Sequence, residues 1–476
     1  MKKILLTLSI VLSAIAFTFA QSILKGKIID GKTEKAISYA NISIENSKGT
    51  VSNEHGEFIF SNLKAGIYDL QVSFVGYETS KQKIQLKDNE IVNLIVKLNS
   101  TSITADEVVI TATKTENYIK DIPTRINLIS PRQIEALPAQ TTDELLAFVP
   151  GININRSFGI YSHSAAVTMR GLNGQEQGRV LVMIDGISVN KSDGGSVNWN
   201  LLNNDQIDRI EVVKGPGSSL YGGNAMGGAI NIITKKPTEK IQGKFSADYG
   251  TYNTMRSQLY LAGRLNPSTD KGFYWNLSSF YRQSDGYMTA SEADQLANKY
   301  LVKSDLNEWA ATAKIGYDIN QFNGLELDMI YYDDDRATGE KVFQPEGNNR
   351  EHDTYQVRAK YNGQKNNLSW NINLFYLNED YKRISEYYKD DYTFYKVLSE
   401  RVDLGALSSL SYNLKNQVIT GGIDLKQGSV DAKDVYYTST DIVYNRGKMN
   451  TLGLFVQDEI KLLNEKLKVI AGLRFD

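Results

Sequence analysis

The chain has 476 residues, enough for two or three domains, and a formal net charge of −2. This balance gives no sign of a nucleic-acid partner, which requires a basic surface. The absence of cysteine excludes disulfide and zinc–thiolate sites, and three scattered histidines without an HExxH pattern indicate no metal or cofactor site. The 28 tyrosines and the lack of a long apolar run beyond the N-terminus suit a β-barrel with aromatic girdles, although glycan-binding β-proteins are also tyrosine-rich.

Residues 1–20 have the pattern of a secretory signal peptide. Two lysines follow Met1, an apolar run extends from Ile4 to Phe19, and small residues precede a cut expected after Ala20. A membrane anchor is the alternative, but the run is short for one. The chain is therefore expected to be secreted across the inner membrane.

Residues 22–99 are predicted to form a compact β-sandwich. Short alternating runs recur about every ten residues between turn residues such as Asp30-Gly31, which indicates about seven strands. Two segments resemble the sequence of the carboxypeptidase regulatory-like domain: GKIIDGKTEKAISYANISI and, after it, GEFIFSNLKAGIYDLQVSFVGYE. The resemblance is to an accessory domain without zinc ligands or catalytic residues, so a periplasmic interaction module is expected.

Residues 100–116 are predicted to be a polar linker that carries a short β-branched run, Asp106-Glu107-Val108-Val109-Ile110-Thr111-Ala112. A tethered strand of this kind has unpaired backbone donors and acceptors, so it can add to the sheet edge of a partner. The alternative is an ordinary first strand of the domain that follows.

Residues 117–236 are predicted to form a small mixed α/β domain. Ser130-Pro131-Arg132-Gln133 has the residues of a capping box, and Thr141-Thr142-Asp143-Glu144 repeats that pattern before a second short helix that ends at Pro150-Gly151. Val180–Ile184 is an apolar strand run, and Asp185-Gly186 turns the chain toward Ile187–Val189.

The densest motif is IDRIEVVKGPGSSLYGGNAMGGAINIITKK, residues 207–236, in which six glycines lie between two β-branched runs. A phosphate-binding loop is excluded, since neither the third glycine of a dinucleotide fingerprint nor a Gly-Lys-Ser/Thr sequence is present. The segment closely resembles the end of the plug domain of TonB-dependent outer-membrane receptors, with the pattern I-x-R-I-E-V-x-x-G-P-x-S-x-x-Y-G-x-x-A-x-x-G-x-I-N-I-I-T. Upstream, Val167-Thr168-Met169-Arg170-Gly171 resembles the I-R-G signature of the same family, with Met169 in place of isoleucine.

This resemblance implies that residues 106–112 are the TonB box, the segment that TonB grips and pulls with energy from the inner-membrane ExbB–ExbD complex. Within the plug, Arg209 and Glu211 occupy alternate positions of one strand and share a face, and Arg170 is a candidate for the same surface. Because buried charges need partners, these three residues are expected to bond the barrel wall and lock the plug. The alternative is a solvated strand face.

Residues 237–476 change to long alternating strands, about eleven in number, which are typical of a transmembrane β-barrel with its apolar face toward lipid. The clearest run is Leu467, Val469, Ala471, Leu473 and Phe475. Short connections are expected at 266–272, 320–324, 362–367, 413–416 and 463–466, and long loops at 284–307, 333–353, 378–400 and 426–448. A secreted β-sandwich shows similar alternation but has no reason to alternate short and long connections.

Eleven strands are about half of the roughly twenty-two that the family resemblance implies. An open sheet edge in lipid leaves backbone groups unsatisfied, so we expect a fragment of a longer receptor or the product of a truncated gene. The expected fold class is therefore mainly β: an N-terminal sandwich, a small α/β plug at 117–236, and an incomplete antiparallel transmembrane barrel.

The functional hypothesis is an outer-membrane receptor, without enzymatic activity or a cofactor, that imports a scarce and bulky nutrient. A ferric siderophore or similar metal chelate is expected, because the DEVVITATKT box and compact plug resemble those of metal-chelate receptors. Import of cobalamin, haem or an oligosaccharide stays open, as does a non-transporting adhesin or glycan-binding β-protein. TonB and outer-membrane lipid are the other expected partners. The acidic and aromatic loop residues do not identify the ligand-binding positions.

Overall fold

The computed structural model describes residues 22–31, 33–44, 48–74, 77–99, 108–111, 114, 117–119, 122, 124–171, 178–267, 269–463 and 466–476. The predicted signal peptide, and Asp106, Glu107 and Ala112 of the predicted TonB box, lie outside these residues. The chain divides into two compact units, Met1–Glu107 and Val108–Asp476, and each has its own core.

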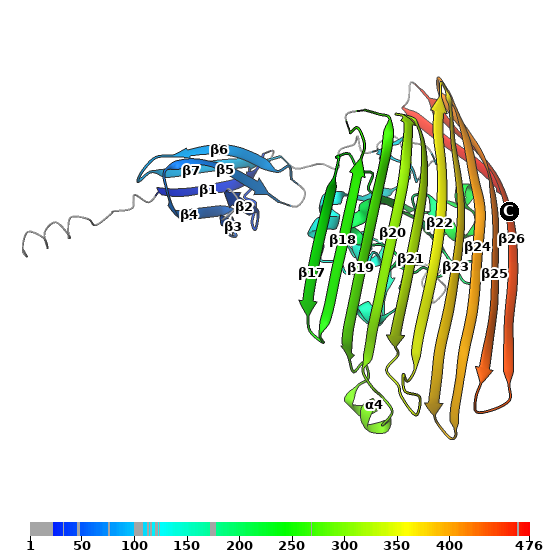
Figure 1. The fold of residues 1–476 in the computed structure, drawn as a ribbon. Helices are drawn as coiled ribbons and strands as arrows, with labels where there is room; N and C mark the ends of the chain where they lie inside the picture. Colours follow the sequence, from blue (N-terminus) through cyan, green and yellow to red (C-terminus); the bar gives the residue numbers. More distant parts are fainter. Residues whose placement is uncertain are drawn as a thin grey trace, which may run out of the picture. The chain divides into compact units, whose positions relative to one another are not determined.

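The first unit is a β-sandwich. One sheet has the strand order β4-β1-β7 and the other β3-β2-β5-β6 (Figure 1). The strands are β1 (Ser22–Asp30), β2 (Asn41–Ile44), β3 (Lys48–Val51), β4 (Glu57–Leu63), β5 (Gly66–Ser73), β6 (Ser80–Leu86) and β7 (Ile91–Leu98). Both sheets direct alternate apolar side chains, among them Leu24, Ile42, Phe58 and Leu70, into one core. The seven strands expected from the alternation are all present.

The second unit begins with a small α/β domain, the plug, whose central sheet has the order β10-β15-β16-β13-β14. Its strands are β8 (Val108–Val109), β9 (Asn117–Tyr118), β10 (Ile126–Ile129), β11 (Ile152–Asn155), β12 (Ala166–Met169), β13 (Val180–Ile184), β14 (Ile187–Ser188), β15 (Ile207–Lys214) and β16 (Gly228–Thr234). Its helices are α2 (Pro131–Ala136) and α3 (Ser218–Tyr221), with 3-10 turns η2 (Asp143–Phe148), η3 (Gly159–Tyr161), η4 (Asn204–Gln206) and η5 (Gly223–Ala225). The apolar run 180–184 is fully buried because β13 lies inside this sheet.

The two predicted capping boxes have different outcomes. At α2, the hydroxyl of Ser130 accepts from the amide of Gln133 and the Gln133 side chain accepts from the amide of Ser130, as predicted. The second prediction is wrong, because the Thr141 hydroxyl has no hydrogen-bond partner among the described residues, Thr142 makes no capping bond and η2 is a 3-10 helix. The Glu144 carboxylate, in the first turn of η2, instead accepts from the amide of Gln140, at 2.7 Å.

The glycine-rich motif brings β15 and β16 together. These strands pair antiparallel, with Glu211 opposite Asn231 and Lys214 opposite Gly228. Gly228 has φ +151°, and a Cβ at this position would lie 2.3 Å from the carbonyl oxygen of Val213. A side chain is therefore excluded at the point where the returning strand approaches β15.

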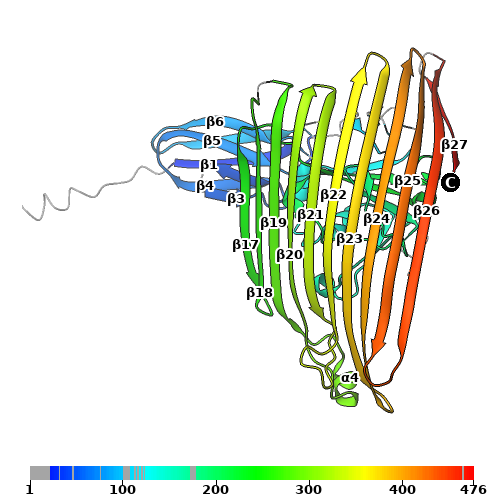
Figure 2. The same ribbon diagram turned by 45° about the vertical axis from the view of Figure 1, so that its right-hand side comes forward.

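The rest of the second unit is one antiparallel sheet of eleven strands, which are hydrogen-bonded in sequence order. They are β17 (Gln242–Gly250), β18 (Thr254–Arg264), β19 (Gly272–Tyr287), β20 (Ser304–Asn320), β21 (Asn323–Ala337), β22 (Asn349–Lys365), β23 (Leu368–Tyr388), β24 (Tyr392–Leu414), β25 (Gln417–Tyr436), β26 (Ile442–Leu462) and β27 (Leu467–Phe475). Figures 1 and 2 show a curved wall with the plug against its concave face. In β19, Asn276, Ser278 and Arg282 are buried on this face, while Phe273 and Leu277 are exposed on the convex one.

The expected connections need one correction. The five short turns occur where predicted, but residues 378–400 and 426–448 are mostly strand and not long loops. β23 and β24 are joined by a tight turn between Tyr388 and Tyr392, because their alternating pattern continues through polar residues. Longer connections remain at 288–303, which contains α4 (Glu292–Ala297), and at 338–348. Within the described ranges, no helix has the length and apolar character needed to cross a membrane.

Candidate functional site

The described part of the predicted TonB box lies against the plug. Val108 and Val109 form β8, which pairs antiparallel with Tyr118 and Asn117 of β9. Val109 and Thr111 are buried. The segment is thus held as a short strand and turn, and it does not add to the edge of the central plug sheet.

A buried carboxylate of the plug holds this segment. Glu211, on β15, is fully buried, and its Oε2 accepts from the amides of Ile110 at 3.0 Å and Thr111 at 2.9 Å and from the Thr111 hydroxyl at 2.6 Å. Its Oε1 accepts from Nε of Arg209 at 3.1 Å. One carboxylate therefore satisfies two backbone donors from a segment that precedes it by about a hundred residues. We call this set of contacts the Glu211 clamp.

Two further side chains enclose the same segment. The Tyr221 hydroxyl donates to the carbonyl of Thr111 at 2.8 Å. The Lys114 ammonium lies 5.0 Å from the ring centre of Tyr221 and 4.0 Å from that of Phe455 on β26. Burial lowers the pKa of Lys114 to about 8, although the Asp424 carboxylate, 3.9 Å away, opposes this shift. The segment is therefore fastened to the plug and, through Lys114, also to the wall.

The expectation for the plug-locking residues needs correction. Arg209 and Glu211 do share one face, but Arg209 bonds Asp208 and Glu211, and the partners of Glu211 are the N-terminal segment and Arg209. The Arg170 guanidinium lies beside Gly215, within the plug. None of these contacts reaches the wall. The reason is that this face of β15 is covered by residues 110–111, a contact between segments that sequence spacing does not reveal.

Other residues bond the plug to the wall. The plug turn after β13 contributes Asp185, which accepts from Lys314 of β20 at 2.8 Å, and the carbonyl of Ile184, which accepts from Arg358 of β22 at 3.0 Å. Burial would raise the pKa of Asp185, but Lys314 and Arg358 hold it below its ordinary range. A second plug turn contributes Lys191, which pairs with Glu379 at 2.5 Å. The only sequence signal for these wall residues is charge at concave-face positions of the strands.

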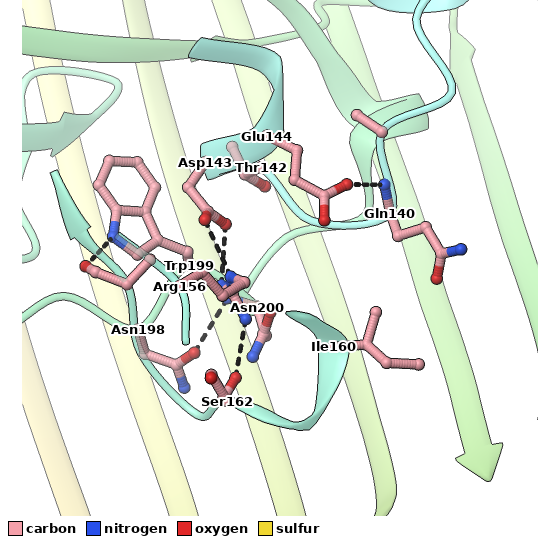
Figure 3. A network of polar contacts seen from close by, with 12 residues as sticks. Gln140, Thr142, Asp143, Glu144, Arg156, Ile160, Ser162, Asn198, Trp199 and Asn200 are labelled. Carbon is pink, nitrogen blue, oxygen red and sulfur yellow. Dashed lines mark hydrogen bonds and ion pairs between the residues drawn. The ribbon is translucent and has the colours of Figure 1, made fainter. Parts of the chain in front are cut away.

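A third contact is the loop of residues 156–163, which a buried ion pair within the plug supports. Figure 3 shows Arg156 directed at Asp143, with Nε–Oδ2 and NH2–Oδ1 distances of 2.9 and 2.8 Å. NH1 of Arg156 also donates to the carbonyl of Ser162 at 2.7 Å. Both ion-pair partners are buried, so the pair fixes the loop. The carbonyl of Ile160 in this loop accepts from Arg336 of β21 at 2.5 Å.

These features define a class of protein: a plug enclosed by an antiparallel wall, with an N-terminal segment clamped in the plug. Residues 119–229 match the family model of the TonB-dependent receptor plug domain, residues 24–110 that of the CarboxypepD_reg-like domain, and residues 293–476 that of the TonB-dependent receptor-like β-barrel. The chain belongs to the TonB-dependent receptor family. Members of this family are outer-membrane transporters and not enzymes.

Individual relatives support the same assignment. The chain is 39% identical over 131 residues to the vitamin B12 transporter BtuB of Vibrio vulnificus, covering 28% of this chain and 21% of that protein. It is 27% identical over 204 residues to the ferric enterobactin receptor PirA of Pseudomonas aeruginosa, covering 40% and 26%. The crystal structure of a mutant of the ferric enterobactin receptor PfeA of Pseudomonas aeruginosa, bound to enterobactin, superposes with a TM-score of 0.59 at 19% identity, covering 74% of this chain and 58% of that one. The matches thus span under half the length of the two curated relatives and 58% of the PfeA chain.

Proposed function

We propose that this protein is a receptor of the bacterial outer membrane that imports a bulky, scarce nutrient, and that its ligand is a ferric siderophore or a similar metal chelate. The Glu211 clamp is the observation that carries the proposal. It ties residues 110–111, within the predicted TonB box, to the central sheet of the plug. A plug whose sheet is bonded directly to an N-terminal segment can be moved by a pull on that segment.

The proposed mechanism is mechanical and involves no covalent chemistry. TonB, energised through ExbB–ExbD, binds residues 106–112 from the periplasm and pulls. The pull removes three donors from the Glu211 carboxylate, which then lies buried with Arg209 as its remaining partner. Because an under-solvated buried carboxylate is unfavourable, the plug sheet rearranges around β15. In this scheme the signal peptide is removed, and the N-terminal sandwich and the box face the periplasm.

Similarity to a protein named for ferric enterobactin supports the proposed ligand class, whereas similarity to proteins named for vitamin B12 supports the cobalamin alternative. Cobalamin and oligosaccharides are the alternative cargoes. No group of three or more His, Asp or Glu side chains suited to a metal ion occurs within the described ranges. The proposal requires no metal site made by the protein alone, because a chelate carries its own metal ligands.

Uptake of radiolabelled ferric chelates by iron-limited cells that express the full receptor tests the proposal, with radiolabelled cobalamin measured in parallel. We expect uptake of a ferric chelate to stop when a protonophore collapses the proton-motive force, and also when residues 106–112 are deleted. Binding of the chelate at the cell surface should persist in both cases. Uptake that continues without the proton-motive force or without residues 106–112 would contradict the proposed mechanism.

A further inference from the structure

Three arginines lie side by side on the concave face of the wall, near the loop 156–163 of the plug. The strand registers place Arg336 of β21 opposite Arg350 of β22, and Arg350 opposite Arg383 of β23. Arg336 and Arg350 lie close to the strand ends that the longer connection at 338–348 joins. Like charges on directly opposed positions destabilise a sheet unless anions compensate them.

Arg336 is fully compensated. Its guanidinium pairs with Glu308 and with Asp334, and it donates to the carbonyl of Ile160. Arg282 of β19 shares Glu308 as its partner. Arg282 and Arg336 therefore both have carboxylate partners, Glu308 and Asp334.

Arg350 and Arg383 are not compensated. NH1 of Arg350 approaches Nδ1 of His163 at 3.3 Å, and NH2 of Arg383 donates to the hydroxyl of Tyr395 at 3.2 Å. In the part of the chain that the structure describes, neither arginine forms an ion pair, and the buried Nε atom of each has no hydrogen-bond acceptor. Beyond Arg383 the same row continues through Val397 to Asp434, so the next carboxylate is two strands away.

The neighbours of the two arginines are mainly rings, and the nearby Asp334 carboxylate, which acts on His163, is already bonded to Arg336 and His352. Burial and the nearby His352 and Arg350 lower the pKa of His163 to about 3, so this ring is neutral and can accept from Arg350. His163 stacks on His352 with ring centres 5.3 Å apart, and Tyr395 stacks on Tyr436 at 4.9 Å. Two arginines without an ion-pair partner in the described ranges thus lie among aromatic rings, Arg350 beside His163 of the plug and Arg383 beside Tyr395 of the wall. Their buried donors without acceptors call for a ligand.

We propose that Arg350 and Arg383 form an anion-binding subsite for the transported ligand, and that this ligand is a negatively charged chelate with carboxylate or catecholate oxygens. Guanidinium groups match such oxygens in geometry and charge. A neutral cobalamin or a neutral oligosaccharide would leave both charges uncompensated. That the ligand is transported rests on the proposed function, whereas the anion subsite rests on the contacts of Arg350 and Arg383.

Binding to the detergent-solubilised full receptor, measured by titration calorimetry without TonB, tests this inference separately from transport. The probes are iron(III) tris-catecholate, which is anionic, and iron(III) tris-acetohydroxamate, which is neutral. We expect the anionic complex to bind and the neutral one to bind at least tenfold more weakly. Arg350→Gln and Arg383→Gln should each weaken binding of the anionic complex by about tenfold or more.

Lys382→Gln is the matched control, because Lys382 is the sequence neighbour of Arg383 on the opposite face and pairs with Glu351. It should change affinity less than about twofold, as expected for a half-exposed pair. If a glutamine variant does not fold, raising the salt concentration with the unaltered receptor gives the same test, since it should weaken the anionic complex alone. Equal affinity for both complexes, no binding of the anionic one, or unchanged affinity in folded arginine variants would each overturn the inference.

Discussion

Replacing Glu211 by glutamine should release the N-terminal segment while leaving the plug folded. The substitution keeps the size of the side chain but removes its charge and replaces one acceptor oxygen by a donor. In the native clamp, Oε2 of Glu211 accepts hydrogen bonds from Ile110 and Thr111, and Oε1 accepts one from Arg209. A single amide oxygen cannot satisfy both groups, so either the segment or Arg209 loses its acceptor.

The size of the effect follows from the bonds involved. Hydrogen bonds to a charged group contribute about 1.5–3 kcal/mol each to stability, and neutral ones about 1 kcal/mol. Converting the three bonds from residues 110–111 from charged to neutral therefore weakens docking of the segment by about 3 kcal/mol, allowing for non-additivity. At roughly 1.4 kcal/mol per factor of ten, this is on the order of a hundredfold in the docking equilibrium.

Amide hydrogen exchange at Ile110 and Thr111 measures this equilibrium, because both amide protons are held by the Glu211 carboxylate. We expect both to exchange on the order of a hundred times faster in Glu211→Gln. Asp208→Asn is the control: Asp208 is partly exposed on the same strand and bonds Arg209 but not the segment. Unchanged exchange at Ile110 and Thr111 in a folded Glu211→Gln protein would refute the clamp.

Two further predictions concern the pH dependence of docking and the glycine motif. The pKa of Lys114 falls from 10.5 to about 8 on docking, so the docked state binds fewer protons between these values, and docking should strengthen as pH rises from 8 to 10.5. Below pH 8, deprotonating or burying the charged Lys114 costs docking about 3 kcal/mol. The mobility of a nitroxide attached at Ala105→Cys should therefore fall as pH rises from 8 to 10.5. This pH dependence should disappear in Lys114→Met. Gly228→Ala should destabilise the plug by about 3–5 kcal/mol in thermal unfolding, because its Cβ would meet the Val213 carbonyl at 2.3 Å. Gly223→Ala, where a Cβ meets nothing within 4 Å, should cost less than about 1 kcal/mol, and equal effects would contradict the steric argument.

The strands and their faces were predictable from the sequence, because they depend on local periodicity. Alternation along β19 separates Phe273 and Leu277 from Asn276 and Ser278, and the structure exposes the first pair and buries the second. In a barrel this pattern is inverted relative to a globular sheet, since polar side chains face the plug. The capping box at Ser130 is equally local, and it was predicted correctly.

The extent of the long hairpins was not predictable in the same way. Residues 378–400 are rich in polar and aromatic side chains, which suggested a loop. The structure continues β23 and β24 to Tyr388 and Tyr392, because paired backbones can extend beyond the apolar band with polar residues on both faces. The alternation of apolar and polar residues identifies only the part of each strand within the apolar band. Backbone pairing with the neighbouring strand decides where the strand ends.

The sequence by itself determined the family, the order of the domains and the strand pattern, since each depends on residues near one another in the chain. Only the tertiary structure decided what the charged residues of the plug do. Glu211 was recognisable as a strand residue on the same face as Arg209, but its partners at 110–111 are far away in sequence. The same holds for Arg350 and Arg383, which resemble any other strand arginines until register and the loop 156–163 bring them together without a carboxylate. Ion pairing and hydrogen bonding depend on distances of a few ångströms between remote segments, and the folded chain alone sets those distances.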